Sequence, residues 1–420
     1  MRILVITIGG SLQPIITSIL QNKPDEIYFL CSPQSEKELA KICAREGVKG
    51  VPYQTEVIEG IDDPNACYTI SLNLLGGLKS KFPDAQIIAD YTGGTKSMSA
   101  GLFTASLDVE GVTLGLVSGD RFNLIKVKDG TQSLRTSHAT QIHVERQIKS
   151  IPNSFKNFDY PTAMSWLEET LSLPDIPLAK QAMLQKWLIL ARGLDSWDKF
   201  DHASAWKFLC NYRATYTNLV MFLEAVTWSR KKLDTNFVRE ELPGLSKSPK
   251  GHGYELVEDL FLNAQRRATQ HRFDDAVARL YRALELLAQA RLKLQYGIDT
   301  GDVSLENLPQ QLRGQYESTA NPGGKIKLPL TPAFELLANL TAFYPEPLGE
   351  VYQQYKNQVK DFLSIRNKSL LAHGLTPVRA EDYKKAELFF TAFVDESFSK
   401  LALKPYAARK QFPLHPGGSS

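Results

Sequence analysis

The stretch AQIIADYTGGTKSMSAGLFTASLD, residues 85–108, decides the fold of the N-terminal part of the chain. It begins with an apolar run of strand length, passes through two glycines, and ends in residues that suit a helix, TKSMSAGLFTASLD. A buried strand that leads directly into a helix is the building unit of a parallel sheet with helices on both faces. The stretch therefore predicts an α/β domain.

The residues on either side of this stretch repeat the same alternation. Further strands are predicted at ILVITIG (3–9), EIYFLCS (26–32), VPYQTEVI (51–58), VTLGLVSG (112–119) and FNLIKVK (122–128), with helices in the intervals between the earlier ones. Continuous apolar strands between helices are typical of a sheet that is buried on both sides. We expect residues 1–136 to form a Rossmann-like domain.

Helical periodicity replaces this alternation beyond residue 136. The glycine- and proline-rich stretch PGLSKSPKGHG (243–253) is a plausible domain boundary, so we expect a helical linker domain at 137–250 and a second helical domain at 251–410. The polar end of the chain, 411–420, is expected to be disordered. The predicted fold class is an α/β Rossmann-like domain followed by all-α helical domains.

Composition excludes several classes of function. The 420 residues carry a net charge of only +3, so the chain lacks the overall positive charge of proteins that coat nucleic acid. The four cysteines form no CxxC pair, which argues against a disulfide framework and a cysteine-based metal site. The sequence shows no signal peptide and no apolar run of the roughly 18 residues that a membrane span needs. We expect a cytoplasmic protein without metal.

Two glycine-containing loops follow predicted strands. They are GGSLQ (9–13) and DYTGGTKSM (90–98), and ligands of open parallel sheets bind at such strand ends. Glycine lets backbone N–H groups approach a phosphate, while Thr95, Lys96 and Ser97 supply further donors and charge. The spacing fits neither the GxxxxGK[ST] loop nor the GxGxxG fingerprint. The second loop predicts an anion site; the first is either part of it or a tight turn.

The C-terminal half contains a pair of basic residues at unusual positions. Residues 350–373, EVYQQYKNQVKDFLSIRNKSLLAH, are predicted to form one helix that ends before Gly374. Its apolar stripe runs through Val351, Tyr355, Val359 and Phe362 and continues into Arg366, Leu370 and His373. Two such helices packed across a twofold axis would place two arginines and two histidines in one anion-binding site. The alternative is a helix end with a stray basic residue and a capping histidine.

These motifs resemble those of a known family. DYTGGTKSMSAG together with GGSLQP is similar to the ligand loops of the CRISPR-associated Rossmann-fold (CARF) domain. IRNKSLLAHG resembles the R-x4-6-H motif of HEPN ribonucleases, with six residues between Arg366 and His373. A CARF domain followed by a HEPN domain is the architecture of ancillary ribonucleases of type III CRISPR systems. Residues 140–250 match no motif.

The resemblance implies a ligand for the first domain. CARF domains dimerise and bind cyclic oligoadenylate, a ring of AMP units, across their twofold groove. The residues that carry over to the two ligand loops are Gly9, Gly10, Ser11, Gln13, Gly93, Gly94, Thr95, Lys96 and Ser97. The ring would act as an allosteric activator rather than as a cofactor, and neither loop indicates whether it contains four or six adenylates.

The resemblance also implies a reaction. HEPN enzymes cut single-stranded RNA without metal, because the 2′-hydroxyl of the substrate attacks the adjacent phosphate and leaves a 2′,3′-cyclic phosphate. Arg366 would stabilise the charged phosphorane, His373 would act as acid or base or position the phosphate, and Asn367 would orient the substrate. We expect a homodimeric endoribonuclease of antiviral defence. The alternative is an inactive HEPN domain, with the CARF domain acting as a sensor or ring nuclease.

Overall fold

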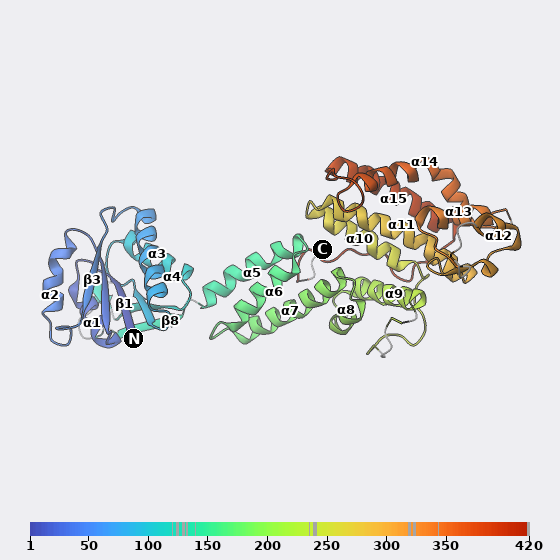
Figure 1. Ribbon diagram of the computed structural model, residues 1–420. Helices are drawn as coiled ribbons and strands as arrows, with labels where there is room; N and C mark the ends of the chain where they lie inside the picture. Colours follow the sequence, from blue (N-terminus) through green and yellow to red (C-terminus); the bar gives the residue numbers. More distant parts are fainter. Residues whose placement is uncertain are drawn as a thin grey trace. The chain divides into compact units, whose positions relative to one another are not determined.

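The computed structural model (Figure 1) divides the chain into two compact units. It describes residues 1–119, 121–122, 126–127, 131, 133–138, 140–234, 236–237, 242–317, 321, 325–342 and 344–417. The N-terminal unit comprises residues 1–149 and 172–178, and the C-terminal unit comprises residues 150–171 and 179–420. The sequence predicts a separate linker domain at 137–250, whereas most of these residues pack in the same unit as residues 251–410.

The N-terminal unit is built on one sheet, which contains six strands among the described residues. The strand order is β3-β2-β1-β4-β5-β8. The strands are β1 (Arg2–Thr7), β2 (Glu26–Cys31), β3 (Tyr53–Val57), β4 (Gln86–Asp90), β5 (Val112–Ser118) and β8 (Ser133–His138). The first five are parallel, and β8 pairs antiparallel with β5 at the edge. This is the Rossmann-like arrangement that the alternating pattern predicts.

The edge of this sheet differs from the sequence prediction. The strand expected at 122–128 is replaced by two short strands, β6 (Arg121–Phe122) and β7 (Lys126–Val127), which form a separate pair. Residues 123–125 and 128 of that prediction lie outside the described residues. The sixth strand is β8, whose sequence SLRTSH lacks the apolar run by which β1, β2, β4 and β5 are recognised.

Helices cover both faces of the sheet (Figure 1). Alternate residues of β1 point to opposite faces, so Leu4 and Ile6 pack in one core while Ile3 and Val5 pack in the other. The first core includes α1 (Leu12–Asn22) and α2 (Leu39–Cys43), and the second includes α3 (Pro64–Lys81) and α4 (Lys96–Asp108). Burial on both faces explains why the centre of β1, residues 3–6, is apolar.

The remaining helices belong mainly to the C-terminal unit. They are α5 (Thr140–Lys156), α6 (Tyr160–Ser172), α7 (Leu178–Asp198), α8 (His202–Leu209), α9 (Thr217–Leu233), α10 (Glu255–Thr269), α11 (Phe273–Tyr296), α12 (Gln310–Tyr316), α13 (Leu330–Leu340), α14 (Pro347–Lys368) and α15 (Ala380–Lys400). A small antiparallel pair of strands, β9 (Val303–Ser304) and β10 (Lys325–Ile326), lies among them in the chain. Among the described residues, no helix combines the length and apolar character needed to cross a membrane.

Helix α11 lies at the centre of the C-terminal core and packs against α10, α13, α14 and α15. Helix α14 contributes Val351, Val359 and Phe362, which are all buried. The sequence prediction of a buried stripe on this helix is therefore confirmed for those three positions. Because α14 is held along this stripe, the direction in which its C-terminal end leaves the core is fixed.

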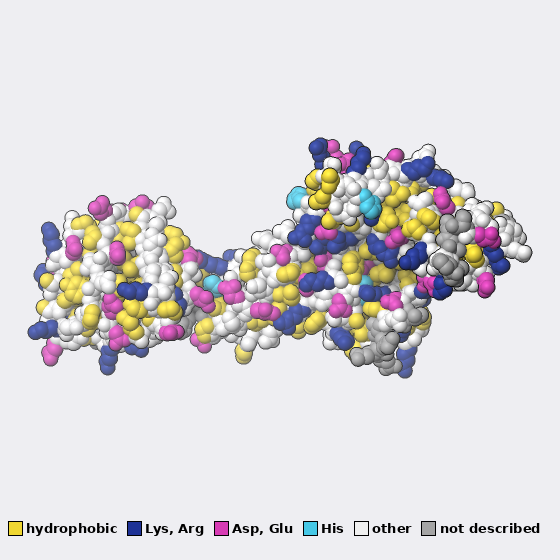
Figure 2. Space-filling view, in the orientation of Figure 1, with side chains coloured by type: hydrophobic (Ala, Val, Ile, Leu, Met, Phe, Trp, Pro, Cys, Tyr) yellow, Lys and Arg dark blue, Asp and Glu magenta, His cyan; other side chains and the backbone are white. Residues whose placement is uncertain are grey.

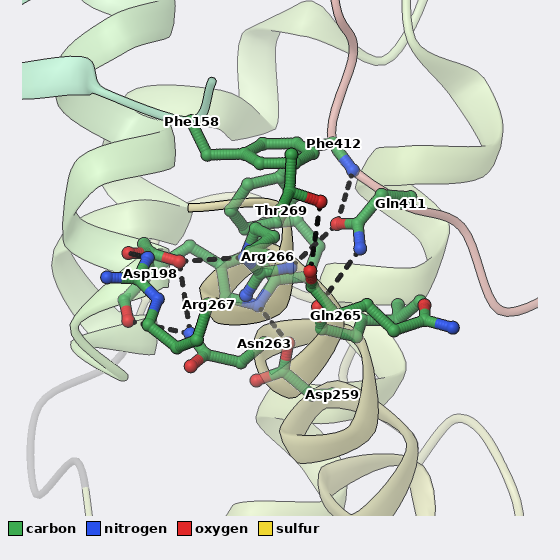
Figure 3. Close-up of polar contacts among 12 residues, drawn as sticks. Phe158, Asp198, Asp259, Asn263, Gln265, Arg266, Arg267, Thr269, Gln411 and Phe412 are labelled. Atoms are coloured by element: carbon green, nitrogen blue, oxygen red, sulfur yellow. Dashed lines mark hydrogen bonds and ion pairs between the residues drawn. The ribbon is translucent and has the colours of Figure 1, made fainter. Parts of the chain in front are cut away.

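Buried charges connect α7 to α10 within this unit. Arg266 and Arg267 of α10 both pair with Asp198, the last residue of α7, and Arg266 is completely buried (Figure 3). Nε of Arg266 lies 2.7 Å from Oδ1 of Asp198. Removing one member of such a buried pair leaves an uncompensated charge, which is strongly destabilising. This pairing explains why the linker helices and the helices of residues 251–410 form one unit.

The last described residues fold back as a strap over the same helices. Phe412 is 2% exposed and lies under Arg266, whose guanidinium carbon is 3.8 Å from the ring centroid. Gln411 accepts a hydrogen bond from Arg266 and donates one to the carbonyl of Leu262 (Figure 3). The prediction of disorder for 411–420 is therefore wrong for residues 411–417, because one aromatic anchor and its partners supply the burial that holds them. Residues 418–420 lie outside the described residues.

Phe412→Ala is expected to lower the free energy of unfolding of the C-terminal unit by about 3–5 kcal/mol, the usual cost of emptying a buried phenylalanine site. Tryptophan fluorescence during urea denaturation measures this unit alone, since all five tryptophans lie in it. Leu414→Ala is the matched control, because Leu414 sits in the same strap but is 45% exposed. Equal loss in both variants would contradict the anchoring role of Phe412.

Candidate functional site

The two predicted ligand loops meet at one point of the sheet. Strands β1 and β4 are neighbours, and β2 and β5 continue from them in opposite directions. The carboxyl ends of β1 and β4 therefore flank the position at which the strand order reverses, where open α/β sheets bind their ligands. The loop after β1 begins at Ile8, and the loop after β4 begins at Tyr91.

Glycine is what lets the two loops touch. A Cβ added at Gly93 would lie 2.4 Å from the carbonyl oxygen of Thr7, and one added at Gly9 would lie 2.6 Å from the nitrogen of Gly94. The hydroxyl of Thr7 donates a hydrogen bond of 2.7 Å to the carbonyl of Gly93. The structure thus brings together the two segments that the sequence indicates separately.

Asp90, which sequence reasoning does not include among the site residues, organises the second loop. Its fully buried carboxylate accepts hydrogen bonds from the backbone N–H of Thr92, at 2.8 Å, and from the hydroxyls of Thr92 and Ser18. The hydroxyl of Thr92 in turn accepts from the N–H of Val117 at 2.8 Å. The sequence signal for this role is a carboxylate at the end of an otherwise apolar strand. A buried charge needs hydrogen-bond donors around it, so such a residue is expected to organise the neighbouring loop.

The polar residues of the loops divide into two groups. The hydroxyls of Thr95 and Ser97 donate to the carbonyls of Ile61 and Asp62, so they anchor the loop, whereas the sequence expects them to donate to a ligand. Exposed donors remain at the N-termini of two helices, which favour anions. These donors are Ser11 and Gln13 at the start of α1 and Lys96 at the start of α4, with the exposed backbone of Gly10 beside them.

The second candidate site lies at the end of α14, which is shorter than predicted. The helix ends at Lys368, and Ser369 is extended, so His373 does not lie in a last helical turn as the periodicity suggests. The reason is hydrogen bonding by Ser369: its hydroxyl donates to Asp274 of α11 and accepts from the N–H of Leu371. Serine competes in this way with helical hydrogen bonding.

The chain then turns back against the end of α14. We call residues 369–378 the histidine loop. The N–H groups of Gly374 and Thr376 donate to the carbonyls of Ser369 and Lys368, both at 3.1 Å. A Cβ at Gly374 would lie 2.0 Å from the carbonyl oxygen of Lys368, so only glycine fits there. His373 is exposed in this loop, beside the end of the helix rather than within it.

Arg366 lies in the last turn of α14 and is half-buried. Its guanidinium carbon is 4.4 Å from the ring centroid of Tyr281 on α11, and Nη1 donates to the side-chain oxygen of Asn367 at 3.1 Å. Burial raises the pKa of Tyr281, and nearby Glu285 adds to this, while Arg366 acts in the opposite direction. The phenol therefore stays neutral near pH 7 and offers an aromatic face to the cation.

Comparisons with known proteins agree with this layout. Residues 247–396, which contain Arg366, Asn367 and His373, match the family model of the Csm6 HEPN domain. The chain is also 23% identical over 385 residues to the CRISPR system endoribonuclease Csm6 of Thermus thermophilus, covering 88% of this chain and 79% of that protein. These matches support the resemblance of the chain to CARF–HEPN ribonucleases.

The fold of this chain has a solved counterpart along almost its whole length. The structure of Enterococcus italicus Csm6 bound to cyclic hexa-2′-fluoro-hexa-dAMP superimposes with a TM-score of 0.62. The match covers 96% of this chain and 95% of that one, at 15% sequence identity. The order of a Rossmann-like domain followed by helical domains is thus shared from end to end.

The histidine loop also exposes hydrophobic side chains. Leu370, Leu371 and Leu375 are 63%, 59% and 87% exposed, and Leu388 on α15 is 64% exposed. Figure 2 shows hydrophobic atoms at the surface of the C-terminal unit, among lysine and arginine side chains. Three exposed leucines within six residues are unusual for a free surface.

In the described residues, no three His, Cys, Asp or Glu side chains are placed to hold a metal ion.

Proposed function

We propose that this chain is a CARF–HEPN ribonuclease and forms a homodimer that a cyclic oligoadenylate activates to cut single-stranded RNA, without metal, in type III CRISPR antiviral defence. One observation carries the proposal. The two glycine loops join into a single polar cradle at the strand switch point, in a chain whose other unit matches the Csm6 HEPN family. This supports a ligand site in one unit and a cleavage site in the other.

The ligand cradle suits a phosphodiester ring. Its backbone N–H groups and two helix N-termini favour anions, and Lys96 adds a positive charge at the rim. A ring of identical units with twofold symmetry presents the same phosphate pattern to two protomers. The side-chain donors that we assign to it are Ser11, Gln13 and Lys96, while Thr95 and Ser97 hold the second loop in place.

The exposed leucines favour a second copy of the chain at the cleavage site. Leu370, Leu371 and Leu375 surround His373 in sequence, so a partner that covers them also approaches the histidine. A single protomer offers one arginine and one histidine in the motif; two protomers offer two of each. A symmetric pair of histidine loops would bury the leucines and concentrate the cationic groups around one phosphate.

The reaction requires no atom from outside the substrate. The 2′-hydroxyl oxygen forms a bond to the adjacent phosphorus as its proton leaves, and the bond from phosphorus to the 5′-oxygen breaks as that oxygen gains a proton. His373 transfers one of these protons, and Arg366 stabilises the negative charge that grows on the phosphorane. Activation follows if the ring binds one arrangement of the dimer more tightly than another.

The decisive test is RNA cleavage by the purified full chain in EDTA, with no ring, with cyclic tetra-adenylate, with cyclic hexa-adenylate, or with linear hexa-adenylate. We expect one ring to raise the rate by at least about tenfold, a coupling of usual size, and the linear control to have little effect. Products should end in a 2′,3′-cyclic phosphate. Ring binding without cleavage would support a sensor instead, and conversion of the ring to linear product would reveal a ring nuclease.

A further inference from the structure

Helix α11 places two side chains next to the cleavage residues. Asp274 lies in its first turn and Tyr281 lies seven residues later. Seven residues span nearly two helical turns, so both side chains project from the same face, roughly 10 Å apart along the axis. Neither residue belongs to the R-x4-6-H motif, yet each contacts the segment that carries it.

Asp274 fastens both ends of the histidine loop. One carboxylate oxygen accepts a hydrogen bond from the hydroxyl of Ser369, the first residue of the loop. The other accepts a hydrogen bond of 3.0 Å from the N–H of Val378, the last residue. Ser369 and Val378 are buried, whereas His373 between them is exposed. A single carboxylate of α11 thus holds both ends of a ten-residue loop.

Tyr281 supports the other half of the motif. Its ring lies under the guanidinium of Arg366, with 4.4 Å between the guanidinium carbon and the ring centroid. This contact restricts a side chain that otherwise has many rotamers. The ring is neutral, so it orients the cation without cancelling the charge that Arg366 would bring to a phosphate.

We propose that Asp274 and Tyr281 are positioning residues, through which α11 fixes where His373 and Arg366 lie relative to each other. The inference rests on the proposed function, because it concerns the same cleavage site. Misplacing a catalytic group by about 1 Å can cost roughly 100-fold in rate. A rigid helix in the middle of the core is well suited to prevent such misplacement.

The chemistry at Asp274 makes a conservative variant informative. An asparagine can accept from the N–H of Val378 through its oxygen, while its amide donates to the hydroxyl of Ser369, which reverses its role. Both ends of the loop then stay attached without the negative charge. Alanine removes both hydrogen bonds. Asp274→Asn should therefore behave like wild type where Asp274→Ala does not.

The test compares kcat and KM for RNA at saturating ring in Asp274→Ala, Asp274→Asn and Asp275→Ala. Asp275 is the matched control, since it carries the same charge on the same turn but pairs with Arg279. We expect Asp274→Ala to lower kcat by roughly 10- to 100-fold with little change in KM or in urea midpoint. Asp274→Asn and Asp275→Ala should stay within about threefold of wild type, as conservative and remote changes do.

Tyr281 is tested in the same assay. Tyr281→Phe keeps the ring under Arg366 and should retain kcat, whereas Tyr281→Leu removes it and should lower kcat by roughly tenfold, the scale of a partly desolvated cation–π contact. The ring's Kd should not change in any of these variants, because their positions lie in the C-terminal unit. Equal kcat in wild type and Asp274→Ala, or equal loss in Asn and Ala variants, would overturn the proposal.

Hydrogen exchange separates this inference from the proposed function. The N–H groups of Gly374 and Thr376 are hydrogen-bonded in the loop and should exchange slowly in wild type and in Asp275→Ala. Asp274→Ala should make them exchange faster, whether or not any ring activates the enzyme. Unchanged exchange in Asp274→Ala would refute the positioning role even if cleavage is observed. Faster exchange in Asp274→Ala, together with a wild type that does not cleave RNA, would refute only the proposed function.

Discussion

Replacement of His373 by alanine is expected to lower the ring-stimulated kcat for RNA by about 10²–10⁴-fold, the range that proton transfer by a positioned side chain contributes. Arg366→Ala should cost about 10²–10³-fold, as the loss of one electrostatic contact to a charged transition state does. Both effects fall on kcat because the phosphorane charge and the proton transfers exist only in the transition state. The measurement is single-turnover cleavage of a labelled RNA at saturating ring.

The control for these variants is Lys360→Ala. Lys360 is exposed on the same helix as Arg366 and carries the same charge, but it lies almost two turns away. It should cleave RNA within about twofold of wild type, as surface changes away from a site usually do. Cleavage by the His373 and Arg366 variants at the wild-type rate would place the reaction elsewhere in the chain. The Kd of the ring, measured in parallel, is expected to be the same in all three.

The sequence predicts β1, β2 and β4 well because each of these parallel strands has a local signal. Residues 3–6 of β1 are buried on both faces of the sheet, so they are apolar without a break, whatever their distant partners. Strand β8 lacks such a signal, since its place is set by pairing with β5. The Csm6-like fold along the whole chain confirms the predicted fold class.

The C-terminal features that the sequence misplaces all depend on contacts made far along the chain. The early end of α14 follows from the bond between Ser369 and Asp274, which are 95 residues apart. The order of the strap follows from Phe412 and Arg266, separated by more than a hundred residues. Periodicity describes a helix in isolation and carries no information about such distant partners. It therefore indicates Arg366 and His373 but not the loop in which His373 lies.

Gly93→Ala is expected to abolish activation of RNA cleavage by the ring, raising the ring's Kd by at least about 100-fold. The added Cβ would lie 2.4 Å from the carbonyl oxygen of Thr7, far inside van der Waals contact. The oxygen belongs to the backbone and the Cβ is fixed to the backbone, so neither atom can rotate away. The two loops must separate, and the hydrogen bond from Thr7 to the carbonyl of Gly93 is strained with them. A cradle built from both loops then no longer presents its N–H groups together, and preorganised donors account for much of anion affinity.

The matched control for that change is Gly76→Ala in α3. A Cβ at Gly76 meets nothing within 4 Å, so the same chemical change is made in the same unit without a clash. Alanine also favours a helix over glycine by up to about 1 kcal/mol, so this variant should be as stable as wild type or more stable, with full activation. Isothermal titration with the ring and cleavage at increasing ring concentration measure both variants. Because the substitution lies in the N-terminal unit, basal cleavage without ring should persist in Gly93→Ala; a ring Kd equal to that of Gly76→Ala would mean that the ligand binds away from the joined loops.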